Sequence, residues 1–315
     1  MQEASAQENR ELFSFWAFGD LHYRAQPAWH EVHTRRLAPM FQDLRRLWQE
    51  QGPPAFCVSP GDIVETCARE NYQVARASLE EHLDGIPFYA GVGNHEYHGP
   101  DGEDPAQMAA IFTEFWGKPV RYTWQVEQAP EVVCIMLDYP DPHNGQADPE
   151  RIVISRETLD FLDTSLREHA DQLALIFLHC PLYDTVLDRD PARRRDYHSL
   201  QHFFAPEPES SQQVRDILAR HKHASLVFSG HTHSGWEAPG LVKTEQLGGY
   251  PVTFVNLMSP WYTGRGSGNY TGKYLADDPD MIPSFSIRIY PEQASIRVRE
   301  HRMRRWLKEW QIPLR

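Results

Sequence analysis

Residues 87–96 read Pro-Phe-Tyr-Ala-Gly-Val-Gly-Asn-His-Glu, an apolar run followed at once by Asn94, His95 and Glu96. The run 87–92 predicts a buried strand, because it is short, apolar and followed by glycine. Residues that can bind metals or transfer protons therefore follow the carboxyl end of a strand, which is where sites form in α/β sheets. The stretch predicts an α/β fold with its chemistry at one edge of a sheet.

Four more strand-like runs end in the same kind of residue. They are followed by Asp20-Leu21-His22, Gly61-Asp62, His179 and Gly230-His231-Thr232-His233. With Asn94, these pieces offer two carboxylates, one amide oxygen and four imidazoles. Such a set can hold two metal ions at the carboxyl ends of the strands. A pair of ions is a common means of hydrolysing phosphate esters with an activated water.

The ligand types indicate which metals fit. Asp62 is the natural bridge between two ions because a carboxylate has two oxygens, and Asn94 adds an oxygen without adding charge. Asp20 and His22 are two residues apart, as are His231 and His233, so in an extended chain each pair points to one side. Mixed nitrogen and oxygen ligation favours transition metals. We expect two divalent or mixed-valence ions of Mn, Fe, Zn, Co or Ni, with Mn and Fe favoured.

Four further residues are expected to assist the ligands. His95 is not needed as a ligand and is the candidate general acid or charge stabiliser for the leaving group. Glu96 is expected to hydrogen-bond His95 and orient it. Glu65 is expected to support the site from behind the ligands, and His98, three residues past His95, is a candidate for substrate contact.

Periodicity predicts alternating strands and helices up to about residue 230, and mostly strands afterwards. The expected strands are 12–18, 55–59, 87–92, 132–138, 173–178, 225–229, 252–257, 284–290 and 294–300. The expected helices are 33–50, 69–82, 155–170, 211–221 and a closing helix at 303–310. Arg302, Arg304, Arg305 and Lys308 would form the solvent-facing side of that closing helix.

The domain organisation expected is simple. Residues 1–10 form a flexible N-terminus, and 11–315 form a single domain with a motif core at 19–233 and C-terminal strands and helix at 250–315. Long surface loops are expected at 139–151, 181–210 and 259–283. The basic run from Arg189 to Arg195 is interpreted as a solvated loop, with a phosphate clamp as the alternative.

The composition limits the classes of partner that we expect. The chain has 315 residues and a formal net charge of −13, which argues against electrostatic capture of nucleic acid. A small phosphorylated substrate stays compatible, because bound metal ions reverse the sign locally. No long apolar run predicts a membrane span. The four cysteines form no C-x-x-C pair, and Cys57 and Cys134 lie in apolar runs, so we expect buried free thiols and a cytoplasmic protein without a signal peptide.

The five blocks, in their order from Gly19 to His233, resemble the calcineurin-like metallophosphoesterase superfamily. The resemblance implies a four-layer α/β/β/α sandwich of two mixed sheets flanked by helices. It implies that one ion is held by Asp20, His22, Asp62 and His233. It implies that the other ion is held by Asp62, Asn94, His179 and His231. His95 matches the catalytic histidine of that superfamily.

Two features of the sequence indicate the branch of the superfamily. The Ser/Thr protein phosphatases have an arginine directly before Gly-Asn-His-Glu, where this chain has Val92. His179-Cys180-Pro181 resembles instead the His-x-Pro block of cyclic-nucleotide phosphodiesterases and relatives of purple acid phosphatases. Glu65 stands where many members have aspartate.

These observations lead to an expected reaction. The chain is predicted to hydrolyse phosphate esters, first of all a small phosphodiester or nucleotide, with a hydroxide that bridges the two ions. A phosphomonoesterase, including a protein phosphatase, is the alternative, and a nuclease ranks third. A non-catalytic scaffold on the same fold is the alternative from another class. The oligomeric state is not indicated.

Overall fold

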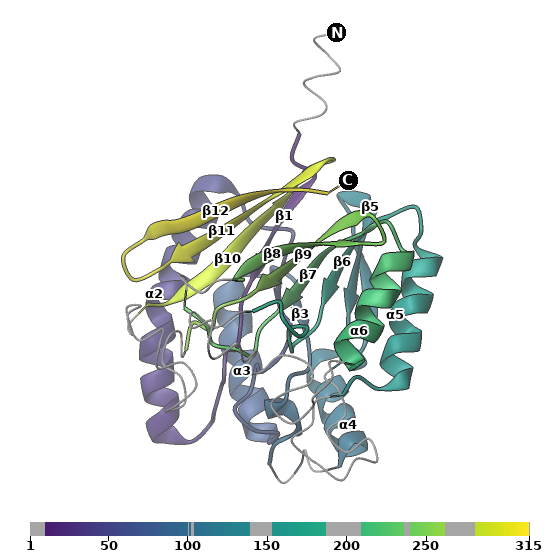
Figure 1. Ribbon diagram of the computed structural model, residues 1–315. Coiled ribbons are helices and arrows are strands. Elements are labelled where there is room, and N and C mark those ends of the chain that lie inside the picture. The colour runs from purple at the N-terminus through teal and green to yellow at the C-terminus, as the bar shows by residue number, and fades with distance from the viewer. Residues whose placement is uncertain are drawn as a thin grey trace, which may run out of the picture.

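Two six-stranded mixed sheets lie face to face between layers of helices, as Figure 1 shows. The computed structural model describes residues 10–99, 101, 104–138, 153–186, 209–235, 240–261 and 281–314. The predicted α/β/β/α arrangement of two mixed sheets and flanking helices is therefore confirmed. Most of the predicted N-terminal segment, loop 139–151, the basic run Arg189–Arg195 and most of loops 181–210 and 259–283 lie outside the described residues.

The first sheet combines three parallel strands with three antiparallel ones. Its order is β12 (Arg305–Pro313), β11 (Gln293–Glu300), β10 (Pro283–Ile289), β1 (Phe13–Ala17), β2 (Phe56–Ser59) and β3 (Phe88–Ala90). β1, β2 and β3 are parallel, and β10 pairs with the free side of β1. Helices α2 (Pro27–Gln51) and α3 (Arg69–Leu83) pack on its outer face (Figure 1). The C-terminal strands thus widen the sheet that carries the first ligand loop.

The second sheet is parallel in its centre and antiparallel at both edges. Its order is β4 (Tyr122–Val126), β5 (Ala129–Met136), β6 (Leu173–Phe177), β7 (Ala224–Ser229), β9 (Tyr250–Asn256) and β8 (Val242–Leu247). Helices α5 (Arg156–Glu168) and α6 (Glu209–Arg220) cover its outer face (Figure 1). Ser155 caps α5 by accepting a hydrogen bond of 3.1 Å from the Thr158 amide. None of the described helices combines the length and apolar character needed to cross a bilayer.

Aromatic side chains fill the space between the sheets. Phe15 of β1 stacks on Phe56 of β2 with ring centroids 4.8 Å apart, and it meets the edge of Phe228 from the opposite sheet at 5.5 Å. Both contacts are fully desolvated, and burial of each such side chain stabilises the fold by about 1.5–3 kcal/mol. Cys57, Cys67, Cys134 and Cys180 are buried free thiols, as expected.

The closing helix predicted at 303–310 is wrong, because these residues form a turn and then strand β12. Trp306 and Trp310 are four residues apart, which suggests one face of a helix. In the structure, Trp306 pairs with Arg299 and Trp310 with Ile296 of β11, on either side of a register shift. Edge strands β4 and β8 were not predicted, because polar side chains interrupt both runs. Helix α4 (Pro105–Trp116) and the short helix η1 (His95–Tyr97) were also not predicted.

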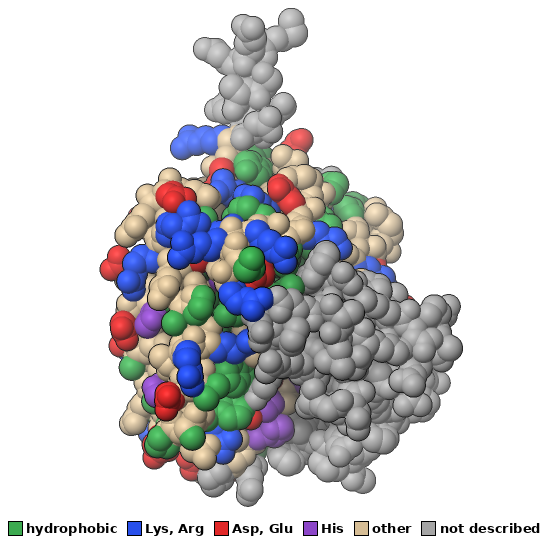
Figure 2. Space-filling model, turned by 90° about the vertical axis from the view of Figure 1, so that its left-hand side faces the viewer, with side chains coloured by type: hydrophobic (Ala, Val, Ile, Leu, Met, Phe, Trp, Pro, Cys, Tyr) green, Lys and Arg blue, Asp and Glu red, His purple; other side chains and the backbone are tan. Residues whose placement is uncertain are grey.

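Basic and polar side chains cover the surface around β10–β12. Figure 2 shows Lys and Arg side chains gathered on the upper part of the face that carries α2 and the β11–β12 hairpin. Arg302, Arg304, Arg305 and Lys308 are exposed there, as predicted for this run although on a different element.

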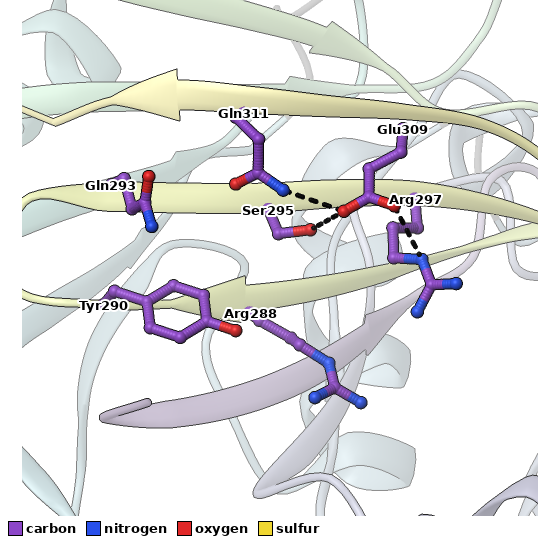
Figure 3. A pocket seen from close by; sticks show the side chains of 7 residues that line it. All are labelled: Arg288, Tyr290, Gln293, Ser295, Arg297, Glu309 and Gln311. Carbon is purple, nitrogen blue, oxygen red and sulfur yellow. Dashed lines mark hydrogen bonds and ion pairs between the residues drawn. The ribbon is translucent and has the colours of Figure 1, made fainter. Parts of the chain in front are cut away.

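An open depression of about 640 Å³ lies on the outer face of these strands, at the end far from the ligand loops (Figure 3). Glu309 accepts hydrogen bonds from Ser295 and Gln311 and pairs with Arg297. Its carboxylate thus has three partners within the protein, so the depression is no candidate for the functional site.

Asp43 ties the middle of α2 to the end of β11. Arg299 donates two hydrogen bonds to its carboxylate, at 2.7 and 3.0 Å, and the His301 ring lies 3.1 Å from the same group. His301 in turn meets the Ser284 hydroxyl of β10 at 2.6 Å. Burial raises the pKa of Asp43, but the hydrogen bonds from His301, Arg299 and Arg46 outweigh it and hold that pKa well below its usual range.

Substitution Asp43→Asn is expected to lower the free energy of unfolding by about 3 kcal/mol, because it leaves the buried Arg299 without its counter-charge. In the wild type the same stabilisation is present above pH 4 or so and is lost as the pH falls further, because the folded-state pKa is lowered. Urea unfolding measures both effects. Glu50→Gln removes an exposed partner of Arg46 and is the control, with an expected loss below about 1 kcal/mol. Equal losses in the two variants would contradict the prediction.

Candidate metal centre

The carboxyl ends of five strands bring all seven predicted ligand residues to one edge of the two sheets. Asp20 and His22 follow β1, Asp62 follows β2 and Asn94 follows β3. The second sheet contributes His179 after β6, and His231 and His233 after β7. The structure brings the seven side chains together as expected, and loops of both sheets contribute them.

One group of four side chains surrounds a single point. Asp20, His22, Asp62 and His233 each offer a ligand atom, and these atoms all lie within 4.8 Å of one another. The Nε2 atoms of His22 and His233 are 3.2 Å apart, and His233 Nε2 lies 3.7 Å from Asp20 Oδ1. The four residues are those that the resemblance assigns to one ion.

A second group shares Asp62 with the first. Asp62, His179 and His231 form it, again with ligand atoms within 4.8 Å. His179 Nε2 lies 3.2 Å from Asp62 Oδ2 and 3.2 Å from Asn94 Oδ1. Two groups that meet at one carboxylate are what a pair of ions with a bridging aspartate requires.

The chemical state of these side chains suits the binding of metal ions. Within the described part of the chain, the buried Oδ2 atom of Asp20 has no hydrogen-bond partner, which is costly unless a cation is bound. His22 Nδ1 lies 3.0 Å from Glu65 Oε2, and Nε2 is the ring nitrogen that faces the other ligands of the cluster. Burial lowers the pKa of His22 to about 3, and it lowers that of His233 well below its usual value. Both rings are neutral near pH 7, as ligands must be.

The pKa values of His179 and Asp62 shift in opposite directions. Burial lowers the pKa of His179, but the charge and hydrogen bond of Asp62 outweigh it and raise the value to about 9. Burial would raise the pKa of Asp62, but His179 and His95 hold it well below its usual range. Asp62 is thus the carboxylate that stays ionised at every working pH.

The ligand loops converge through strained backbone and not through extended chain. His22, Asp62, His231 and His233 have φ angles of 53°, 51°, 70° and 48°, in the left-handed region that side-chain-bearing residues rarely adopt. Asp20 and His22 do meet in one ligand group, but the expected reason, an extended chain, is wrong. Each such residue costs of order 1–3 kcal/mol, and strain of this kind is concentrated at functional sites.

Glu96 does not orient His95 as predicted. Its two carboxylate oxygens accept four hydrogen bonds, of 2.6 to 3.2 Å, from backbone amides, those of Asp62, Ile63, Val64 and Gly93. Burial and the charge of Asp62 raise the pKa of Glu96 to about 7. Glu96 therefore fixes the backbone after β2 to the backbone after β3.

His95 is oriented by a different residue. Its Nδ1–H donates to the backbone carbonyl of Glu65 at 2.7 Å, which leaves Nε2 as the atom that can exchange a proton with a bound molecule. The ring meets that of His22 edge to face, with centroids 4.6 Å apart. The exposed ring of His98 lies 5.0 Å from His95.

Close approach of two loops requires glycine at position 93. A Cβ there would overlap the carboxylate of Asp62. The His95 amide donates to the same carboxylate at 2.9 Å, so the loops after β2 and β3 touch directly at the shared ligand. Any side chain at Gly93 would push Asp62 away from both groups.

Three residues that sequence reasoning did not assign hold the ligand loops in place. His33 of α2 is buried, and its Nε2–H donates to the Leu21 carbonyl at 2.6 Å. The Asn256 amide donates to the Gly230 carbonyl at 2.9 Å, and the Ser259 hydroxyl donates to the Asp20 carbonyl at 2.7 Å. For His33 a signal existed, since it lies four residues before Leu37 on the apolar face of α2.

Residues 13–235 match the model of the calcineurin-like phosphoesterase family. This range is well over half of the chain, so the protein belongs to that family. A probable cyclic nucleotide phosphodiesterase from Synechococcus sp. is 25% identical over 207 residues, which are 65% of this chain and 66% of that relative. The chain thus spans just under two thirds of that relative.

Two solved structures share the fold. Purple acid phosphatase PPD1 from yellow lupin seeds has a TM-score of 0.57 and 11% identity, over 96% of this chain and 53% of its own. GAP50, the anchor in the inner membrane complex of Plasmodium, has a TM-score of 0.57 and 11% identity, over 96% of this chain and 89% of its own. At such identities the likeness concerns the fold alone.

Substitution Glu96→Gln is expected to lower the free energy of unfolding by about 2 kcal/mol, because an amide NH₂ would face backbone N–H groups. Metal affinity is expected to fall as well, since Asp62 loses its fixed position. Urea unfolding with and without Mn²⁺ measures both effects. Glu114→Gln, which removes an exposed partner of Arg69, is the matched control. Two variants with the same stability and metal affinity would show that the Glu96 contacts are unimportant.

Proposed function

We propose that this protein is a metal-dependent phosphoesterase whose substrate is a small phosphodiester or nucleotide. The observation that carries the proposal is the pair of ligand groups that share Asp62 at the meeting point of five strands. The family match supports the reaction class, and the assignments of residues below are part of the proposal.

Asp20, His22, Asp62 and His233 would hold one ion, and Asp62, Asn94, His179 and His231 the other. Mixed imidazole and oxygen ligands favour Mn, Fe, Zn, Co or Ni, with a Mn or Fe pair preferred. When bound, the ions supply an activated water and neutralise charge on the phosphate oxygens. The strained loops hold the ligands ready, so little of the binding energy is used to order them.

His95 is proposed as the general acid. Its Nδ1–H is fixed on the Glu65 carbonyl, so Nε2 delivers a proton to the departing oxygen. Burial lowers the pKa of His95, but Asp62 and the Glu65 carbonyl outweigh it and raise the pKa, which favours the protonated ring. Glu65 orients His22, Glu96 fixes the loops, and His98 is placed to touch the substrate beside His95.

Two features support a diester over a monoester. The relative from Synechococcus is described as a probable cyclic nucleotide phosphodiesterase. Val92 is fully buried and uncharged, so the loop after β3 carries no cation at the position where protein phosphatases have an arginine. A monoester needs more positive charge at the phosphate than a diester, because it carries one more negative charge.

A non-catalytic scaffold is the second candidate, because GAP50 shares the fold and is described as an anchor. The strained ligand loops weigh against it. A scaffold has no use for four left-handed residues around two carboxylates, whereas a metal centre does.

Substitution His95→Ala is expected to lower kcat for bis-p-nitrophenyl phosphate by roughly 10²–10⁴-fold, the usual contribution of a general acid. The metal content should stay at the wild-type level, because His95 is not a ligand. Asp62→Ala should lose both activity and metal. Elemental analysis and steady-state kinetics on the same preparations separate the two. Near wild-type turnover by a fully metallated His95→Ala protein would exclude the proposed role.

The substrate class is decided by one panel. The Mn²⁺-loaded protein should hydrolyse bis-p-nitrophenyl phosphate and cyclic AMP faster than p-nitrophenyl phosphate. Activity on the monoester alone would rule out the diester preference. A protein that binds metal tightly and hydrolyses none of the three would favour the scaffold.

A further inference from the structure

Arg24 lies at the rim of the metal centre, on the short segment that joins the ligand loop after β1 to α2. The residues on both sides of it are anchored. The Tyr23 amide donates to the Ile63 carbonyl at 2.8 Å, and the Ala25 amide donates to the Asn71 side chain at 2.8 Å. Arg24 follows His22 by two residues, so its backbone position is fixed relative to the ligands.

An aromatic platform holds the guanidinium. The Cζ atom of Arg24 lies 5.3 Å from the ring centroid of Trp29, within the range of a cation–π contact. The Trp29 ring meets Trp261 at 5.2 Å, and its Nε1–H points to the His22 carbonyl at 3.4 Å. The platform is therefore attached to the same backbone that presents the ligand His22.

The charge of Arg24 is not neutralised by an acid of the described part of the chain. Arg24 is only partly exposed, and among the described residues its guanidinium makes no ion pair. The carboxylate of Glu65 lies beside His22, with Oε2 3.0 Å from Nδ1, and forms no ion pair with Arg24 among the described residues. A guanidinium that lies over a ring keeps its in-plane N–H groups for an anion.

We propose that Arg24 binds an oxygen of the substrate phosphate and that Trp29 is its positioning residue. The inference rests on the proposed phosphoesterase function. Arg24 would supply a cation beside the metals. Protein phosphatases have such a cation in the arginine at the position of Val92. Here the cation comes from the other side of the site, from the loop after β1.

The test uses the full-length Mn²⁺-loaded protein and the variants Arg24→Ala, Arg24→Lys and Trp29→Ala. Arg35→Ala is the control, because Arg35 is an exposed arginine on α2 that pairs only with Glu31 among the described residues. Arg24→Ala should raise KM for bis-p-nitrophenyl phosphate and the inhibition constant of inorganic phosphate by roughly tenfold or more, the loss expected for a charge-assisted hydrogen bond. Because ground-state and transition-state binding are lost together, kcat should change by less than about threefold.

The variants distinguish contact from structure. Arg24→Lys should recover part of the affinity, Trp29→Ala should raise KM in the same direction, and Arg35→Ala should change neither constant. Unchanged KM and phosphate inhibition in Arg24→Ala would overturn the proposal, as would a loss that follows a fall in metal content. If the wild type hydrolyses no phosphate ester, the proposed function fails on its own. In that case phosphate binding is measured by titrating the tryptophan fluorescence with inorganic phosphate. Binding by the wild type that Arg24→Ala loses would support the proposed contact, and equal binding by both proteins would overturn it.

Discussion

The burial of Asp20 and Asp62 among four imidazoles is the constraint on which the rest of the structure depends. Two carboxylates this close repel each other, and their desolvation is costly unless cations compensate it. The protein itself supplies part of the compensation, through the His95 and His231 amides that donate to the two carboxylates at 2.9 and 2.8 Å. The remaining deficit, most visible at Asp20 Oδ2, is what gives the site its affinity for positive charge.

Rigid surroundings are needed because the loops themselves are strained. Left-handed residues relax to ordinary conformations unless neighbouring contacts prevent it. Glu96 prevents it after β2 and β3, Asn256 after β7, and His33 with Ser259 after β1. These contacts join loops that are far apart in the sequence, so the site is held by the packing of both sheets and of α2.

The sequence was sufficient for the fold class and for the set of clustered residues, because both depend on strands whose apolar runs end in polar residues. Position along the chain could not show how Glu96 is used, since the backbone amides it binds belong mostly to another loop. The left-handed backbone could not be predicted either, because a histidine such as His22 or His233 does not by itself indicate a positive φ angle. At 303–310 the four-residue spacing of Trp306 and Trp310 suited a helix as well as a strand, and pairing with β11 decided the outcome.

The C-terminal strands lie outside the residues that match the family, yet they contribute to the site through α2. Asp43 binds α2 to Arg299 and His301 at the end of β11, while His33 of the same helix holds the Leu21 carbonyl between two ligands. Ten residues separate His33 from Asp43, about 15 Å along a helix. One helix thus contacts both the end of β11 and the ligand loop after β1. Strands β10–β12 supply no ligand, and they contribute to the site by fixing the position of α2. The first turn of α2 carries Trp29, whose ring contacts Arg24.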